Sequence, residues 1–238
     1  MKTIFYPALE RGHVNLGWLD SFHSFSFGQY HDPKKIHFGA LRVVNDDSIA
    51  GGGGFGTHPH DNMEIVTIPL EGKLAHKDST GNEGIISKGD VQIMSAGTGI
   101  RHSEYNASSK ELARLLQIWV FPKLQNIKPL YGQKTYDLKD RKNNWQVVVS
   151  PDSSEKGLNI NQDARFSLLD LEAGKSSPYQ WKWKNAGVYL FVIEGMVKAG
   201  GHTLSKRDAL GVSETDHLVV EALDDAQLLA IEVPMFGE

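Results

Sequence analysis

The sequence predicts an all-β protein built from two similar domains in tandem, and two features of the chain carry this prediction. Short segments rich in β-branched and aromatic residues alternate with turn residues along most of the chain, and helical periodicity is scarce. The second half of the chain also repeats the pattern of the first half. Short strands with such turn signals are typical of a barrel or a sandwich, and an internal repeat indicates two domains of common architecture.

Strand-like segments follow one another through the first half of the chain. Each is a short run of apolar and β-branched residues that ends at Gly, Pro, Asn or Asp. A polar stretch with Pro129 and Gly132 then interrupts the pattern and is the best linker candidate, and 145–149 starts the second β-rich region. The strands expected before the linker are 22–27, 41–44, 64–68, 73–77, 91–94 and 114–121.

Length and composition narrow the functional classes. At 238 residues, of which 40% are hydrophobic and 23% charged, the chain can bury one large or two medium cores. The formal net charge is −4 and no long basic cluster occurs, so we expect no direct binding of nucleic acid. No apolar run reaches the roughly 18 residues of a membrane span and no signal peptide is visible, so we expect a cytoplasmic protein without membrane contact.

The chain contains no cysteine. Disulfides, iron–sulfur clusters, thiolate nucleophiles and cysteine-ligated zinc are therefore all excluded. Any bound metal must be held by nitrogen and oxygen atoms.

Two pairs of polar residues with the same spacing point to a metal site. His58 and His60 stand one residue apart in an extended segment that follows four glycines, and His102 and Glu104 repeat this spacing farther along. Side chains at positions i and i+2 of a strand point to the same side. If the two segments are neighbouring strands, three imidazoles and one carboxylate converge on one point.

The internal repeat bears on this site. Residues 187–195 align with 64–72 because both segments end in Glu-Gly, and extending the alignment without gaps places Trp181 and Trp183 beneath the first histidine pair. Indoles do not bind divalent metal ions, so we expect the second copy to be structural. His202 and His217 are not expected to be ligands.

The motifs resemble those of a known family. Gly56 with the first histidine pair, and Gly97, Gly99 and His102 downstream, look like the two motifs of a cupin barrel. The longer sequence segments 17–27, 56–65 and 94–104 are similar to hallmark sequences of pirins. The resemblance is strong over 10–122 and weaker beyond.

This resemblance implies a bicupin, which consists of two tandem cupin barrels of the double-stranded β-helix or jelly-roll type. We expect a metal-binding barrel at 1–125, a linker at 126–144 and a barrel without metal ligands at 145–238. Sheet edges in a bicupin can close within one chain, so we expect a monomer.

The resemblance also implies the ligands. Carried over by position, the metal in the first barrel is held by His58, His60, His102 and Glu104. Many general cupins take their carboxylate from the first motif, which here would be Glu64. Pirin-like sequences take it from the second motif, so we favour Glu104 and expect Glu64 to be a cavity residue.

Such a ligand set leaves the identity of the metal open. Zinc fits these ligands but has no redox chemistry, whereas Fe(II), Mn, Co, Ni or Cu suits reactions with oxygen. The resemblance makes Fe(II) the first expectation.

Some pirins show quercetin 2,3-dioxygenase activity, so the resemblance implies a flavonol and O₂ as substrates. Glu104 would then be both a ligand and the catalytic proton acceptor. Flat substrates need apolar walls, and the candidates for these are Phe25, Phe27, Phe55, Met63 and Met94.

Two other functions stay open at this point. Pirins are also described as metal-dependent, redox-sensitive regulators that bind protein partners and show little turnover. A third function is a metal-bound cupin that acts on a different small molecule.

Overall fold

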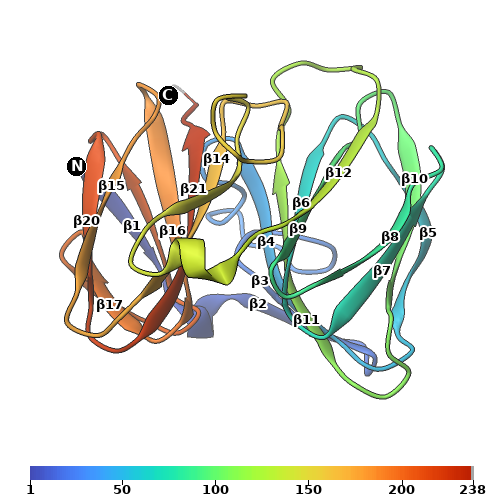
Figure 1. Cartoon of the computed structure of the whole chain (residues 1–238), viewed down its shortest axis with the longest axis horizontal. Helices are drawn as coiled ribbons and strands as arrows, with labels where there is room; N and C mark the ends of the chain where they lie inside the picture. The colour runs from blue at the N-terminus through green and yellow to red at the C-terminus, as the bar shows by residue number, and fades with distance from the viewer. Residues whose placement is uncertain (237–238) are drawn as a thin grey trace.

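The computed structural model describes residues 1–236 and contains two β-barrels side by side (Figure 1). Each barrel has one larger sheet and one four-stranded sheet. The larger sheets of the two barrels face each other across the middle of the molecule (Figure 1). The predicted all-β fold with two tandem barrels is therefore confirmed. None of the helices in the described part of the chain is long and apolar enough to span a membrane.

The first barrel contains β2 to β12. Its larger sheet has the strand order β12-β9-β6-β11-β4-β3-β2, and its smaller sheet has the order β5-β10-β7-β8. The strands are β2 (Gly12–Asn15), β3 (Leu19–His23), β4 (Leu41–Ile49), β5 (Gly54–His60), β6 (Glu64–Glu71), β7 (Lys73–Asp78), β8 (Glu83–Ser87), β9 (Asp90–Ser95), β10 (Ile100–Asn106), β11 (Ala113–Val120) and β12 (Leu130–Thr135).

The second barrel contains β1 and β13 to β21. Its larger sheet has the order β1-β19-β16-β21-β14-β13, and its smaller sheet has the order β15-β20-β17-β18. The strands are β1 (Lys2–Tyr6), β13 (Gln146–Val149), β14 (Arg165–Leu171), β15 (Ser176–Gln180), β16 (Ala186–Glu194), β17 (Met196–Ala199), β18 (His202–Ser205), β19 (Ala209–Ser213), β20 (His217–Ala222) and β21 (Ala226–Pro234). Two short 3-10 helices are η1 (Ala8–Glu10) and η2 (Leu138–Arg141).

Two segments lie in a different place from the one that the sequence suggests. β1, within the expected first domain, pairs antiparallel with β19 of the second barrel, and Tyr6 packs against Tyr189 there. β12, within the expected linker, pairs with β9 and so extends the larger sheet of the first barrel. Both departures join an edge strand to a sheet through backbone hydrogen bonds, which local sequence patterns do not specify.

A shared core joins the two barrels. Along β21, Leu229, Ile231 and Val233 face the core between the barrels, while Leu228 and Ala230 face the interior of the second barrel. A strand that is buried on both faces reads as a continuous apolar run, which explains the composition of β21. In the first barrel, by contrast, the buried side chains include the polar residues His76, His102 and Glu104.

Candidate metal site

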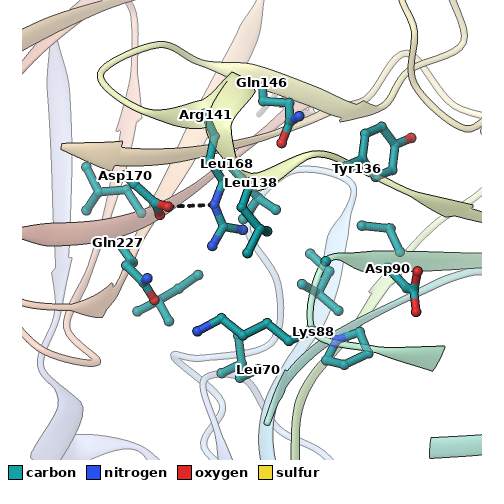
Figure 2. Close-up of a pocket in the computed structure, with 16 residues that line it drawn as sticks. Leu70, Lys88, Asp90, Tyr136, Leu138, Arg141, Gln146, Leu168, Asp170 and Gln227 are labelled. Atoms are coloured by element: carbon teal, nitrogen blue, oxygen red, sulfur yellow. Dashed lines mark hydrogen bonds and ion pairs between the residues drawn. The ribbon is translucent and has the colours of Figure 1, made fainter. Parts of the chain in front are cut away.

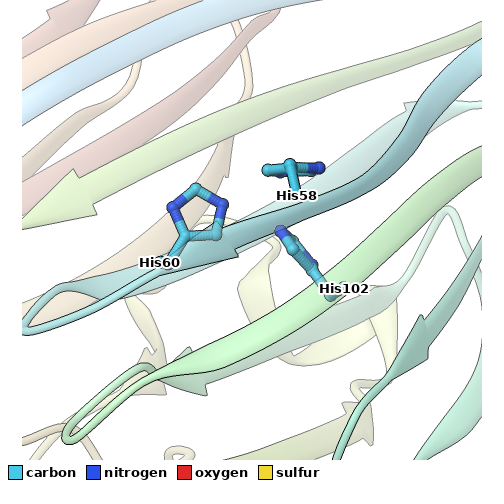
Figure 3. Close-up of side chains that lie close together, drawn as sticks. All are labelled: His58, His60 and His102. Carbon is cyan, nitrogen blue, oxygen red and sulfur yellow. The ribbon is translucent and has the colours of Figure 1, made fainter.

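Three histidines meet on the smaller sheet of the first barrel. β5 and β10 pair antiparallel, and His58 lies directly opposite His102. His60 projects from the same face of β5, so the three imidazoles lie close together (Figure 3). One nitrogen of each ring lies within 4.8 Å of those of the other two. The structure thus brings together the three histidines that the spacing singled out.

A glycine makes this strand pairing possible. A Cβ atom on Gly54 would lie 2.4 Å from the carbonyl oxygen of Glu104 and 2.6 Å from the Cα atom of Tyr105. No larger residue fits without a backbone shift. The glycine-rich approach therefore allows β5 to lie close enough to β10 for the histidines to meet.

Glu104 stands beside the three histidines in a second, overlapping group. A carboxylate oxygen of Glu104 and ring nitrogens of His102 and His76 all lie within 4.8 Å of one another. The group formed by His58, His60 and His102 does not include Glu104. The pairing of β5 with β10 also shifts register between His102 and Glu104. The assignment of Glu104 as a fourth ligand therefore stays a prediction.

The Glu104 carboxylate is held at one oxygen and free at the other. Gln117 Nε2 donates a hydrogen bond to Oε2 at 2.7 Å. Oε1 is buried and has no hydrogen-bond partner in residues 1–236. The free oxygen is available to a metal or a proton.

Glu64 lies elsewhere. Its Oε2 atom accepts hydrogen bonds from Ser95 Oγ at 2.7 Å and from the backbone nitrogen of Asn161 at 3.1 Å. Within the described chain, Glu64 belongs to neither group of metal-ligating side chains. Its hydrogen bond to Asn161 instead connects the two halves of the chain.

Burial keeps the imidazoles of His60 and His102 neutral. It lowers the pKa of His60 to about 4 and that of His102 to about 3, and repulsion from neighbouring histidines adds to both shifts. Burial also raises the pKa of Glu104 to about 7, against the hydrogen bond from Gln117 and with help from the charge of Asp47. At neutral pH His60 and His102 therefore offer lone pairs, which is the form that binds a metal.

Comparisons with known proteins agree with this geometry. The Pirin family model matches residues 7–120, and the model described as Quercetinase C-terminal cupin domain matches residues 147–233. A relative named Quercetin 2,3-dioxygenase, from Escherichia coli (strain K12), is 44% identical over 227 residues, which are 95% of this chain and 96% of the relative. The chain belongs to the pirin family.

Other pirins support this membership. A pirin-like protein from Caulobacter vibrioides is 40% identical over 227 residues, covering 95% of this chain and 97% of its own. The crystal structure of the bacterial pirin YhhW from Escherichia coli in complex with nickel(II) has a TM-score of 0.93 and 41% identity, and the match covers 99% of this chain and 100% of that one. The bicupin prediction is confirmed.

The residues of this pirin fit a bound divalent metal. His102 Nε2 and Glu104 Oε1 are buried and lack hydrogen-bond partners in the described chain. A buried polar atom without a partner costs about 1–3 kcal/mol, which an ion between them would offset. Nitrogen and oxygen donors of this kind suit divalent transition metals.

Several side chains at the site were not singled out by the sequence. His76 and Asp78 on β7 have the same i, i+2 spacing as the histidine pair, and this signal could have identified them. Trp119 on β11 stands edge-on to His60, with ring centroids 4.9 Å apart, and its buried Nε1 atom has no partner in residues 1–236. No spacing signal links Trp119 to the site, because only strand pairing brings it there.

The side chains expected to line an apolar cavity fall into two groups. Phe25 lies in the core between the barrels, so its prediction as a cavity residue is wrong. Its ring contacts those of Tyr6 and Tyr189, with centroids 5.8 Å and 5.6 Å away. Those that lie near Trp119 or His58 are Phe27, Phe55, Met63 and Met94.

Trp181 and Trp183, which the sequence alignment places beneath the histidine pair, lie just after β15, the counterpart of β5, and not on that strand. Trp181 is buried in the barrel core, and the backbone nitrogen of Trp183 donates to Glu232 Oε1 at 3.0 Å. His217 is exposed and contacts its neighbour Asp216, while His202 stacks on Phe5. Within the described residues, neither of these histidines belongs to a group that could hold a metal.

A separate cavity lies between the barrels, away from the histidines (Figure 2). The Arg141 side chain reaches into it and donates from Nε to Asp170 at 2.8 Å. The cavity has a volume of about 30 Å³, which suits one or two water molecules. This cavity is too small for a flavonol.

Proposed function

We propose that this protein is a metal-dependent dioxygenase that cleaves flavonols such as quercetin with O₂. The cluster of His58, His60 and His102 carries the proposal, since neutral imidazoles on two neighbouring strands form a ready metal site. The 44% identity to a relative named Quercetin 2,3-dioxygenase supports the reaction class. This reaction consumes one O₂ per flavonol and releases carbon monoxide and a depside.

Fe(II) is the proposed metal, with His58, His60, His102 and Glu104 as ligands. When bound, the ion acts as a Lewis acid toward the flavonol hydroxyl, and a redox-capable ion also supports oxygen chemistry. The nickel(II) complex of YhhW, which is 41% identical, supports binding of a divalent ion. Mn, Co, Ni, Cu and Zn are the alternatives to test.

Glu104 is the proposed proton acceptor. Its buried Oε1 atom has no partner among the described residues, and burial raises its pKa to about 7, near the value at which a general base works best at neutral pH. Gln117 holds the other oxygen and so fixes the orientation of the carboxylate. The proton of the flavonol 3-hydroxyl would therefore move to the Glu104 carboxylate.

Apolar side chains near the histidines would hold the flat substrate. Trp119 stands edge-on to His60 and packs against Phe27, with ring centroids 5.2 Å apart. Met63 lies in the same apolar cluster. These side chains offer apolar and aromatic contacts to a flat substrate.

The test combines metal analysis with oxygen uptake. The protein is purified without oxygen, loaded with Fe(II) and mixed with quercetin, and the same is done for His102→Ala and for the control His13→Ala. We expect the native protein and the control to consume O₂, while His102→Ala loses both metal and turnover. Full turnover by His102→Ala, or none by the loaded native protein, contradicts the proposal.

The same preparations distinguish the regulatory alternative. A metal-loaded protein that turns over no flavonol but retains one cellular protein, and does so only with metal, would favour a regulator. We further expect a cytoplasmic monomer without direct contact to nucleic acid, which light scattering after gel filtration checks for the oligomeric state.

A further inference from the structure

Each metal-binding imidazole needs its second nitrogen protonated so that the first one keeps its lone pair. A neutral histidine carries one proton, and the hydrogen bond at one nitrogen decides which nitrogen holds it. For His58 a backbone group does this locally, because Nδ1 lies 2.8 Å from the carbonyl oxygen of Gly56 and can only donate to it. His102 has no such carbonyl and contacts another histidine instead.

The hydrogen bonds around His102 begin at Asp78. Burial opposes ionisation of this carboxylate, but hydrogen bonds from Thr80 and Asn82 outweigh it and lower the pKa of Asp78 to about 2. Four donors from these two residues contact Asp78 at 2.7 to 3.1 Å. Asp78 is therefore a buried, ionised acceptor in a rigid turn.

His76 connects Asp78 to His102. His76 Nε2 lies 3.3 Å from Asp78 Oδ2, and since an ionised carboxylate only accepts, Nε2 carries the proton. The lone pair of neutral His76 then sits on Nδ1, which lies 3.4 Å from His102 Nδ1 and 3.4 Å from Gln92 Nε2. An amide nitrogen can only donate, so the contact from Gln92 Nε2 also places a lone pair on His76 Nδ1.

The lone pair on His76 Nδ1 favours one of the two ring nitrogens of His102 as the protonated one. Because His76 Nδ1 can only accept, its contact with His102 Nδ1 is a hydrogen bond when His102 carries its proton there, and Gln92 Nε2 shares the same lone pair. The lone pair of His102 is left on Nε2, the buried atom that has no partner within residues 1–236.

We propose that His76 and Asp78 are positioning residues that hold His102 in the tautomer with a free Nε2 atom and thereby set the metal affinity. This inference rests on the proposed function in taking His102 as a metal ligand. It does not depend on which substrate the protein turns over. In metalloproteins, removal of such a supporting group typically weakens metal binding by about 10- to 100-fold.

The first test is made on the native protein without metal, so it does not depend on any variant folding. Two-bond ¹H–¹⁵N correlation NMR with ¹⁵N-labelled histidine at pH 7.5 reports which ring nitrogen carries the proton. We expect His102 to be protonated at Nδ1 and His76 at Nε2. Protonation of His102 at Nε2 overturns the inference.

The second test measures Ni(II) affinity by competition with a chelator for the native protein and for His76→Phe. Phenylalanine keeps an aromatic ring against Tyr131, which stacks on His76 with centroids 4.8 Å apart, but cannot accept from His102. We expect the dissociation constant to rise about 10- to 100-fold. The Ni(II) absorption spectrum should change as well, since His102 loses its fixed orientation.

The chain offers a matched control. His13 Nε2 contacts Asp20 Oδ1 at 2.6 Å in an exposed imidazole–carboxylate pair on β2 and β3, so His13→Phe makes the same chemical change far from the site. Its Ni(II) affinity should match the native value. An unchanged affinity in His76→Phe, or two Ni(II) ions per native chain, overturns the inference.

Failure of the proposed function gives a different result. If the native protein shows the expected tautomers and Ni(II) affinities but consumes no O₂ with quercetin, the dioxygenase proposal is wrong and the positioning role of His76 and Asp78 stands. If turnover is present but His76→Phe binds Ni(II) as tightly as the native protein, only the proposed positioning role is wrong.

Discussion

Asp47 is a buried carboxylate inside the first barrel, and its replacement by asparagine should change how the stability of the protein depends on pH. The residue is 3% exposed, and its Oδ1 atom accepts a hydrogen bond from Ser21 Oγ. Burial raises the pKa of Asp47 from 3.8 to about 7, with partial compensation by Ser21 and a further increase from the charge of Asp46. The folded protein therefore holds this proton more tightly than the unfolded chain does.

The sign and size of the effect follow from this shift. Because the folded-state pKa is raised, the stabilisation is fully present below pH 3.8 and is lost as the pH rises through about 7. The interval between these two values corresponds to a loss on the order of 4 kcal/mol, at about 1.36 kcal/mol per pH unit. Asparagine cannot ionise, so Asp47→Asn should avoid this loss.

The assay is urea unfolding of the metal-free protein at intervals from pH 5 to pH 9. We expect the unfolding free energy of the native protein to fall by on the order of 2–4 kcal/mol relative to that of Asp47→Asn across this range, since most of the titration of Asp47 falls within it. Asp224→Asn, at an exposed position, serves as the control and should follow the native curve. Parallel curves for the native protein and Asp47→Asn would refute the reasoning.

Four further substitutions test the site and the fold. His58→Ala should remove bound metal while leaving the apparent melting temperature of the metal-free protein within a few degrees, as metal analysis and calorimetry will show. Gln117→Leu leaves Glu104 Oε2 without its donor, so it should cost about 1–3 kcal/mol of unfolding free energy in urea melts and weaken metal binding. Gly54→Ala forces β5 away from β10, so both the melting temperature and the metal content should fall, and native values for both would contradict the packing argument. Trp181→Ala should cost about 3–5 kcal/mol through loss of core packing in the second barrel, yet the folded protein should bind metal with native stoichiometry.

Local patterns predicted most of the strands. The predicted strand 64–68 lies within β6, and the predicted strand 114–121 coincides with β11 except at residue 121. Both were predictable because β-branched runs bounded by turn residues are a local signal. The repeat also placed 187–195 correctly, since β16 occupies in its sheet the position that β6 has in the first. Edge strands were harder, because β1 and β12 are short and their partners are far away in sequence.

The site divides in the same way. The sequence by itself determined that His58, His60 and His102 point to one side of two strands, because side-chain alternation is a local property of extended backbone. Only the tertiary structure decided what surrounds them, since pairing of β10 with β7 brings His76 opposite Glu104, and barrel closure brings Gln117 to its carboxylate. The histidine cluster could be predicted because its spacing is local, whereas His76 and Gln117 lie on strands whose register only the closed barrel sets.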